Sequence, residues 1–169
     1  NGNDSRCSLL NMLVGVPELL ENEVMLAALT VLPTSASVRY ENKSAIWYLA
    51  SDLRTRPSLS TMLSESPKLL ENEAMLTALT ALPTRKSARH ENKSAVWYLA
   101  CQKESRDWLL DSLLNSPVLL KNDAVLKALI ALPTSDAGDF ENKSMLWFFA
   151  YYGSQDIVDR LMKVLIDMP

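Results

Sequence analysis

The chain contains few of the residues on which enzymes and metal sites depend. Its 169 residues include one histidine, His90, two cysteines and four glycines. A single histidine without a cysteine cluster does not make a zinc site, and no glycine-rich phosphate loop is present. Cys7 and Cys101 are too few for a disulfide framework and indicate reduced thiols in a cytoplasmic setting. We therefore expect no catalytic residue, no metal and no cofactor in this chain.

Two further absences narrow the class of protein. Lysine and arginine are outnumbered by acidic residues, 17 against 20, and the formal net charge of −3 argues against a nucleic-acid binder, which needs a basic face. No stretch approaches the ~20 apolar residues of a membrane span, so we expect none. With 30 leucines and only four glycines, the composition favours helix throughout.

The most informative feature is a period of 50 residues, held three times without a gap. When residues 1–50, 51–100 and 101–150 are aligned, 19 of 50 positions are identical in all three. Such identity indicates a tandem array, in which each unit buries its apolar face against its neighbours. We expect one array and a fragment of a longer protein. Its parts are a partial unit over 1–40, units over 41–90 and 91–140, and a partial unit over 141–169.

Each unit predicts three short helices and no strand. In the unit 41–90 the first helix begins after Ser44, whose hydroxyl can cap it, and its apolar sequence indicates burial. The second helix is predicted over 58–64. The third is predicted over 72–82, ended by a proline. The segment 67–71 fits either an extension of the third helix or a separate turn. The predicted fold is therefore all-α, an α-solenoid of about ten helices.

The segment 142–158 resembles an ankyrin repeat, whose pattern reads roughly G-K-T-P-L-H-x-A-A-x-x-G-x-x-E-I-V-x-x-L. Ser144 stands at the capping Thr, Ala150 at the second Ala, Gly153 at the glycine between the helices, and residues 156–158 at Glu-Ile-Val. The chain departs from the family in its Trp at 147 in place of His, in its extra helix and in its period, since ankyrin repeats have about 33 residues. It is similar to expanded, divergent ankyrin-like arrays such as those of effectors secreted by intracellular bacteria. The resemblance implies a protein-binding module in the cytoplasm, or in the host cytosol for an effector.

Two residue types recur once per unit. The tryptophans are Trp47, Trp97 and Trp147, and the arginines are Arg6, Arg56 and Arg106. A fixed tryptophan position favours a buried ladder over an aromatic ligand cage, so we expect Trp97→Ala to cost ~3–5 kcal/mol. For the arginines we favour a ladder of ion pairs between units, with the glutamates of Glu-Asn-Lys-Ser, over a row that binds a ligand.

The units differ most in the segments over 35–40, 85–90 and 135–140, whose formal charges are +1, +3 and −2. Variable loops on a constant frame are typical of partner recognition by repeat arrays, yet loops also vary where nothing packs against them. Trp108 differs too, since Ser8 and Ser58 occupy its position in the sister units, and it is either a local filler or an exposed contact. The candidate partner-binding residues are Arg39, Tyr40, Arg85, Lys86, Arg89, His90, Trp108, Asp136 and Asp139.

These observations predict a protein–protein interaction scaffold that is not an enzyme. The partner is expected to be a protein. Two alternatives remain at this point: a targeting module of a larger enzyme, which would share the same binding surface, and a purely structural spacer, which would need no variable loops.

Overall fold

Every regular element in the described part of the chain is a helix. The computed structural model describes residues 2–32, 43–83, 92–133 and 142–166. Within these ranges it holds eleven α-helices and two 3-10 helices and no strand, which confirms the all-α prediction. The elements are α1 (Gly2–Gly15), η1 (Pro17–Leu20), α2 (Glu23–Thr30), α3 (Ala45–Ser51), α4 (Arg56–Glu65), η2 (Pro67–Leu70), α5 (Glu73–Thr80), α6 (Ala95–Ala100), α7 (Lys103–Asn115), α8 (Pro117–Leu120), α9 (Asp123–Ile130), α10 (Met145–Tyr152) and α11 (Gln155–Ile166).

Three kinds of helix alternate along the chain. The tryptophan helices, α3, α6 and α10, each carry the recurring Trp. The long helices are α1, α4, α7 and α11, and the asparagine-capped helices are α2, α5 and α9. A short helical turn, η1, η2 or α8, stands between a long helix and the asparagine-capped helix that follows it. The segment 67–71 is therefore a separate turn and does not extend the next helix.

Side-chain caps set the start of the helices. The Ser44 hydroxyl accepts a hydrogen bond from the Trp47 backbone N–H at 3.1 Å, as predicted, and the Asn72 side chain accepts one from the Met75 N–H at 3.0 Å. The third helix covers 73–80, shorter than the predicted 72–82. Ala81, with φ of −53° and ψ of 128°, has already left the helical conformation, two residues before the proline at 83.

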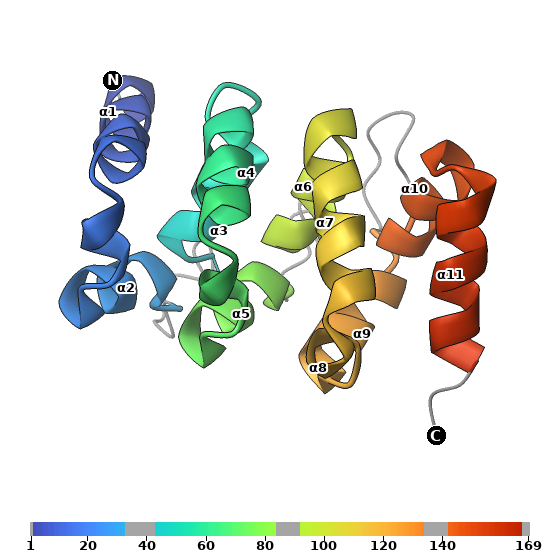
Figure 1. Ribbon diagram of the computed structural model, residues 1–169. Helices are drawn as coiled ribbons and strands as arrows, with labels where there is room; N and C mark the ends of the chain where they lie inside the picture. Colours follow the sequence, from blue (N-terminus) through green and yellow to red (C-terminus); the bar gives the residue numbers. More distant parts are fainter. Residues whose placement is uncertain (1, 33–42, 84–91, 134–141, 167–169) are drawn as a thin grey trace.

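Equivalent helices of successive units lie side by side in three rows. In the tryptophan row α3 packs on α6 and α6 on α10. In the long row α1 packs on α4, α4 on α7 and α7 on α11, and in the third row α2 packs on α5 and α5 on α9. Figure 1 shows the rows running from α1 and α2 at one end to α10 and α11 at the other. Buried apolar side chains from all three rows form one core cluster along the array.

A hydrogen bond from each of the first two tryptophans joins its unit to the next. The Trp47 indole Nε1–H donates to the Lys93 carbonyl oxygen at 2.7 Å, and Trp97 Nε1–H donates to the Lys143 carbonyl oxygen at 2.8 Å. Both rings are buried, with 2% and 3% of their surface exposed, which confirms the ladder interpretation for them. Trp147 is half-buried and stacks on Tyr151 with ring centroids 4.7 Å apart.

The expected ladder of ion pairs between the arginines and Glu41, Glu91 and Glu141 stays a prediction, because these glutamates lie outside the described residues. The buried Arg56 side chain donates from Nε to the Ala50 carbonyl oxygen at 2.7 Å and lies over the ring of Tyr98 in the next unit, 5.4 Å from its centroid. Arg106 lies over Tyr152 at 4.4 Å. Each guanidinium therefore faces an aromatic ring of the next tryptophan helix, and Arg56 also satisfies a carbonyl at the end of α3. Burial lowers the pKa of Arg56.

Candidate functional site

Most of the predicted partner-binding residues lie outside the described part of the chain. These are Arg39, Tyr40, Arg85, Lys86, Arg89, His90, Asp136 and Asp139. Trp108 is the one predicted residue that the structure places. It lies on α7, where its half-buried side chain packs against the core and also lines a surface depression. The indole is thus neither wholly buried filler nor a freely exposed contact.

A groove opens where successive units meet along the asparagine-capped row, once between the units of α2 and α5 and once between those of α5 and α9. The first groove, about 640 Å³ in volume, lies between the segment formed by η1 and α2 and the turn η2; among its lining residues are Leu20, Glu21, Leu26, Ser66 and Lys68. The second groove, about 750 Å³, lies between η2 and α5 on one side and α8 and α9 on the other. Its lining includes Leu70, Glu71, Leu76, Ser116 and Val118. These five residues follow those of the first groove by 50 positions each, so the groove recurs with the repeat.

Trp108 extends the second groove along α7. A smaller depression of about 350 Å³ is lined by Trp108, Asp111 and Ser112 of α7, and it shares Leu70 and Leu119 with the main groove. The two depressions therefore have part of their lining in common, and we use "second groove" for both. Side chains from η2, α5, α7, α8 and α9 line it.

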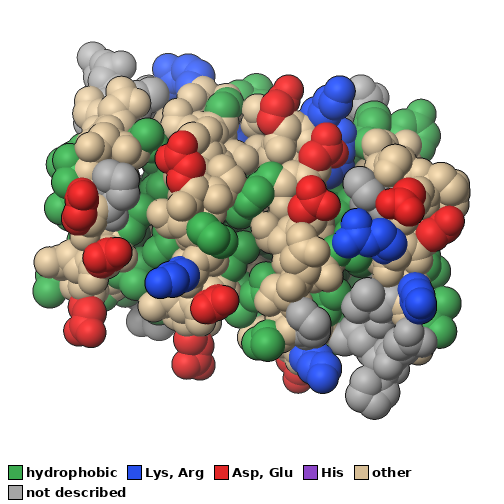
Figure 2. Space-filling model, viewed as in Figure 1, with side chains coloured by type: hydrophobic (Ala, Val, Ile, Leu, Met, Phe, Trp, Pro, Cys, Tyr) green, Lys and Arg blue, Asp and Glu red, His purple; other side chains and the backbone are tan. Residues whose placement is uncertain are grey.

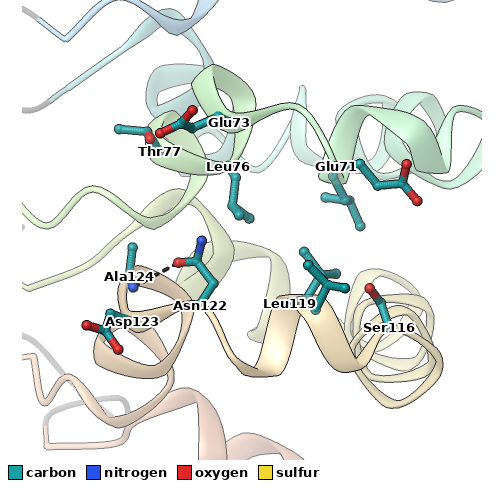
Figure 3. Close-up of a pocket in the computed structure, with 11 residues that line it drawn as sticks. Glu71, Glu73, Leu76, Thr77, Ser116, Leu119, Asn122, Asp123 and Ala124 are labelled. Carbon is teal, nitrogen blue, oxygen red and sulfur yellow. Dashed lines mark hydrogen bonds between the residues drawn. The ribbon is translucent and has the colours of Figure 1, made fainter.

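The floor of the second groove is apolar and its margins are acidic. Figure 3 shows Leu76 and Leu119 pointing into the space between the two segments, while the carboxylates of Glu71, Glu73 and Asp123 lie at its edges. Asn122 does not point freely into the groove, because its side chain accepts hydrogen bonds from the Ala124 and Val125 backbone N–H groups. Leu76 and Leu119 are therefore the side chains that a group bound in this groove would contact.

Charge of one sign surrounds this floor. The described lining of the second groove has four carboxylates and no lysine or arginine; the acidic residues are Glu71, Glu73, Asp111 and Asp123. The first groove has Glu18, Glu21, Glu23 and Glu65, together with Lys68. Acidic side chains are spread over the face shown in Figure 2 and recur along the edge formed by α2, α5 and α9. Acidic residues in a first helical turn also favour the helix dipole, as Glu73 does in α5 and Asp123 in α9.

Among the lining positions at which the second groove differs from the first, three change the charge or the apolar surface in a way that bears on binding. Trp108 replaces Ser58, Val118 replaces Lys68, and Asp111 replaces Thr61. Val118 is 78% exposed although it is apolar. Since serine and lysine fill the sister positions in the same fold, packing of the array does not demand an indole or a valine there. These substitutions remove the cation of the first groove and add apolar surface.

Other chemistry is sparse in the described residues. Cys101 is half-buried, with its Sγ 3.2 Å from the Trp97 carbonyl oxygen, and burial raises the pKa of its thiol to about 12. The thiolate is the nucleophilic form, so this cysteine is suited to packing and not to nucleophilic catalysis. No three His, Cys, Asp or Glu side chains are grouped in the described ranges so as to hold a metal ion. None of the described helices is long and apolar enough to cross a bilayer.

The chain matches no family model, no curated protein and no solved structure.

The groove was not predicted from the sequence, apart from Trp108. It is formed by residues some 50 positions apart, and their adjacency depends on the way in which successive units stack. A signal was nevertheless present. Val118 is apolar where Glu18 and Lys68 are charged, and an apolar residue at a position that is polar in sister units indicates a contact that the frame itself does not require.

Proposed function

We propose that this chain is a protein–protein interaction scaffold, an α-solenoid of ankyrin-like repeats that binds a protein partner and catalyses no reaction itself. The observation that carries the proposal is the recurrence of a groove with leucines on its floor and carboxylates at its margins at two successive junctions. An array that places similar grooves at regular intervals offers an extended surface, which is the feature that repeat proteins use for binding.

The units combine a constant frame with a variable surface. The buried tryptophans, their carbonyl partners and the serine caps are the same in successive units and serve the stack. The residues that differ, Trp108 and Val118 among them, line a groove, and the segments over 35–40, 85–90 and 135–140 differ in formal charge. This division favours recognition over a purely structural spacer, because a spacer has no need of unit-specific surface.

The proposed setting is the cytoplasm, or the host cytosol for an effector. As part of the same proposal, Arg85, Lys86 and Arg89, which lie outside the described residues, contribute to partner binding. Basic residues together with acidic grooves in one array would suit a partner of mixed charge.

Affinity capture tests the proposed function. The chain is immobilised and incubated with cytosolic lysate, and retained proteins are identified after competition with the soluble chain. We expect at least one protein that the soluble chain displaces. In a second arm Arg85→Ala, Lys86→Ser and Arg89→Ala are combined; we expect weaker capture, with the largest difference at low salt, where screening is least. If the unmodified chain retains no competed protein, the scaffold proposal is wrong and the spacer is favoured.

A further inference from the structure

We propose that the second groove binds a short basic peptide segment that inserts an apolar side chain between Leu70, Leu76 and Leu119. This inference rests on the proposed function and names the kind of partner that one of its grooves takes. The shape of the floor, the charge of the margins and the unit-specific residues support it.

The floor fits an apolar anchor. Leu70 and Leu119 are each 5% exposed and Leu76 is half-buried, so they present their remaining surface to the groove from two different units. A volume of about 750 Å³ lies within the ~300–1,000 Å³ of typical ligand sites and accommodates more than one side chain. An apolar side chain that enters this floor leaves water and removes leucine surface from it, which favours binding.

The margins select the charge of the segment. Glu71, Glu73, Asp111 and Asp123 all line the groove, and none of them forms an ion pair with another residue in the described ranges. Four carboxylates without a cation among the described lining disfavour an acidic segment and attract lysine or arginine. Because these margins are exposed, the attraction depends on salt and contributes to specificity and association rate more than to affinity.

Trp108 and Val118 distinguish this groove from its neighbour. A half-exposed indole beside carboxylates is a favourable site for a guanidinium, which can stack on the ring while it pairs with an acid. The exposed Val118 adds apolar contact where the first groove has Lys68, whose charge would repel a basic segment. Tryptophan is also among the residues that most often dominate binding energy at interfaces. The second groove is thus the one that a basic segment should prefer.

A library of short random peptides displayed on phage tests this inference. The library is selected on the immobilised full chain, and the enriched peptides are then synthesised and titrated by fluorescence anisotropy. We expect the enriched peptides to carry net positive charge and at least one large apolar residue, and to bind more weakly as salt rises. Enrichment of acidic or neutral peptides, or no enrichment, would overturn the inference.

Two variants locate the binding site, and a third is the matched control. Trp108→Ser and Val118→Lys install the residues of the sister unit, which the same fold accommodates. We expect each to weaken binding of the enriched peptide by at least ~10-fold. Val24→Lys makes the same change at an apolar residue of α2 that is 79% exposed, against 78% for Val118, and that is not among the lining of either groove; we expect a change of less than ~2-fold.

Equal losses for Val24→Lys and Val118→Lys would also overturn the inference, since the effect would then be one of net charge alone. Circular dichroism of each variant shows whether the fold is kept. The same variants in the lysate capture separate the two proposals. If a competed partner is still retained when Trp108→Ser and Val118→Lys are combined, the scaffold function holds and the second groove is not its site.

Discussion

The indole nitrogen of Trp47 lies 2.7 Å from the carbonyl oxygen of Lys93, in the segment that precedes the next tryptophan helix. The Lys93 side chain turns to Trp97 of its own unit, with its Nζ 5.1 Å from the ring centroid, while its carbonyl receives the hydrogen bond from the previous unit. Ser94 then caps α6 through the Trp97 N–H at 3.2 Å. Neighbouring residues of one short motif therefore join two units and start a helix, which explains why Lys-Ser is unchanged between units.

The tryptophan hydrogen bond leads to the first prediction. Trp47→Phe keeps an aromatic ring but removes the indole N–H, which leaves the carbonyl of the buried Lys93 without this donor. We expect a loss of ~1–3 kcal/mol in the free energy of unfolding, because the buried Lys93 carbonyl loses a hydrogen bond that a phenylalanine ring cannot replace. Trp147→Phe is the matched control, since no hydrogen bond joins its indole nitrogen to a described residue and its ring is only half-buried. Urea unfolding should show the smaller loss for Trp147→Phe; equal losses would contradict this role of the bond.

Asn92 leads to a second prediction. Its φ of 58° is in the left-handed region, and Asn142, 50 positions later, has a φ of 55°. The Asn92 side-chain nitrogen also donates to the Leu132 carbonyl oxygen at 3.2 Å, across to the next unit. Asn92→Ala keeps the Cβ but removes the polar side chain that lets asparagine adopt this conformation, and it removes the hydrogen bond, so we expect a loss of ~1–2 kcal/mol. Asn92→Gly loses the same bond but adopts a positive φ without a steric cost, so it should cost less. Thermal unfolding of both variants tests the order, and a greater loss for the glycine variant would show that the φ angle is not the main cause.

Local features of the fold were predictable from the sequence, and features that depend on stacking were not. The caps at Ser44 and Asn72 were predicted because a cap needs only a polar residue within a few positions of the N–H that it receives. The hydrogen bond and the ring contact of Arg56 were not predicted. The sequence suggested an ion pair with a glutamate of Glu-Asn-Lys-Ser, and those glutamates lie outside the described residues. The carbonyl acceptor of Arg56, Ala50, lies six positions earlier across the turn between α3 and α4, and Tyr98 is brought to Arg56 only when α6 packs beside α3.

The candidate site illustrates the same limit. Trp108 stood out because its sister residues are serines, but its neighbours in the groove, Leu70 and Leu119, are constant between units and gave no signal of their own. A leucine that is constant between units indicates a core position, and both leucines are indeed largely buried. Only the stacked structure shows that their remaining surface faces a groove together with acidic side chains.

Substitution by alanine should have opposite effects at Gly153 and at Gly15, the two described glycines outside the start of α1. A Cβ at Gly153 would clash with the Phe149 carbonyl oxygen, a backbone atom that cannot move without disturbing α10. Gly153→Ala should therefore lower the free energy of unfolding, by ~1–3 kcal/mol. At Gly15, which ends α1, nothing lies within 4 Å of the added Cβ. Gly15→Ala should raise stability by ~0.4–1 kcal/mol, because alanine has less backbone freedom to lose on folding. Paired thermal unfolding measures both; a loss at Gly15 as large as that at Gly153 would rule out the steric explanation.

The last prediction concerns the pH dependence that Cys101 confers. Burial is the largest cause of its raised pKa, about 12 against an ordinary value of 9.0, and the charges of Arg56 and Lys93 oppose the rise. Between these two values the folded chain keeps the thiol proton while the unfolded chain releases it. The contribution to stability is therefore fully present below about pH 9 and is lost as pH rises toward 12. In a Cys7→Ser background we expect the free energy of unfolding to fall by up to about 2 kcal/mol more between about pH 8 and pH 10.5 than it does when Cys101→Ser is added. Serine is the residue at the sister position, Ser51, and does not titrate in this range, so tyrosine and lysine contributions cancel in the difference. Urea titrations of the two chains at both pH values give the four free energies required, and parallel pH profiles would mean that the thiol in the folded chain titrates as it does in water.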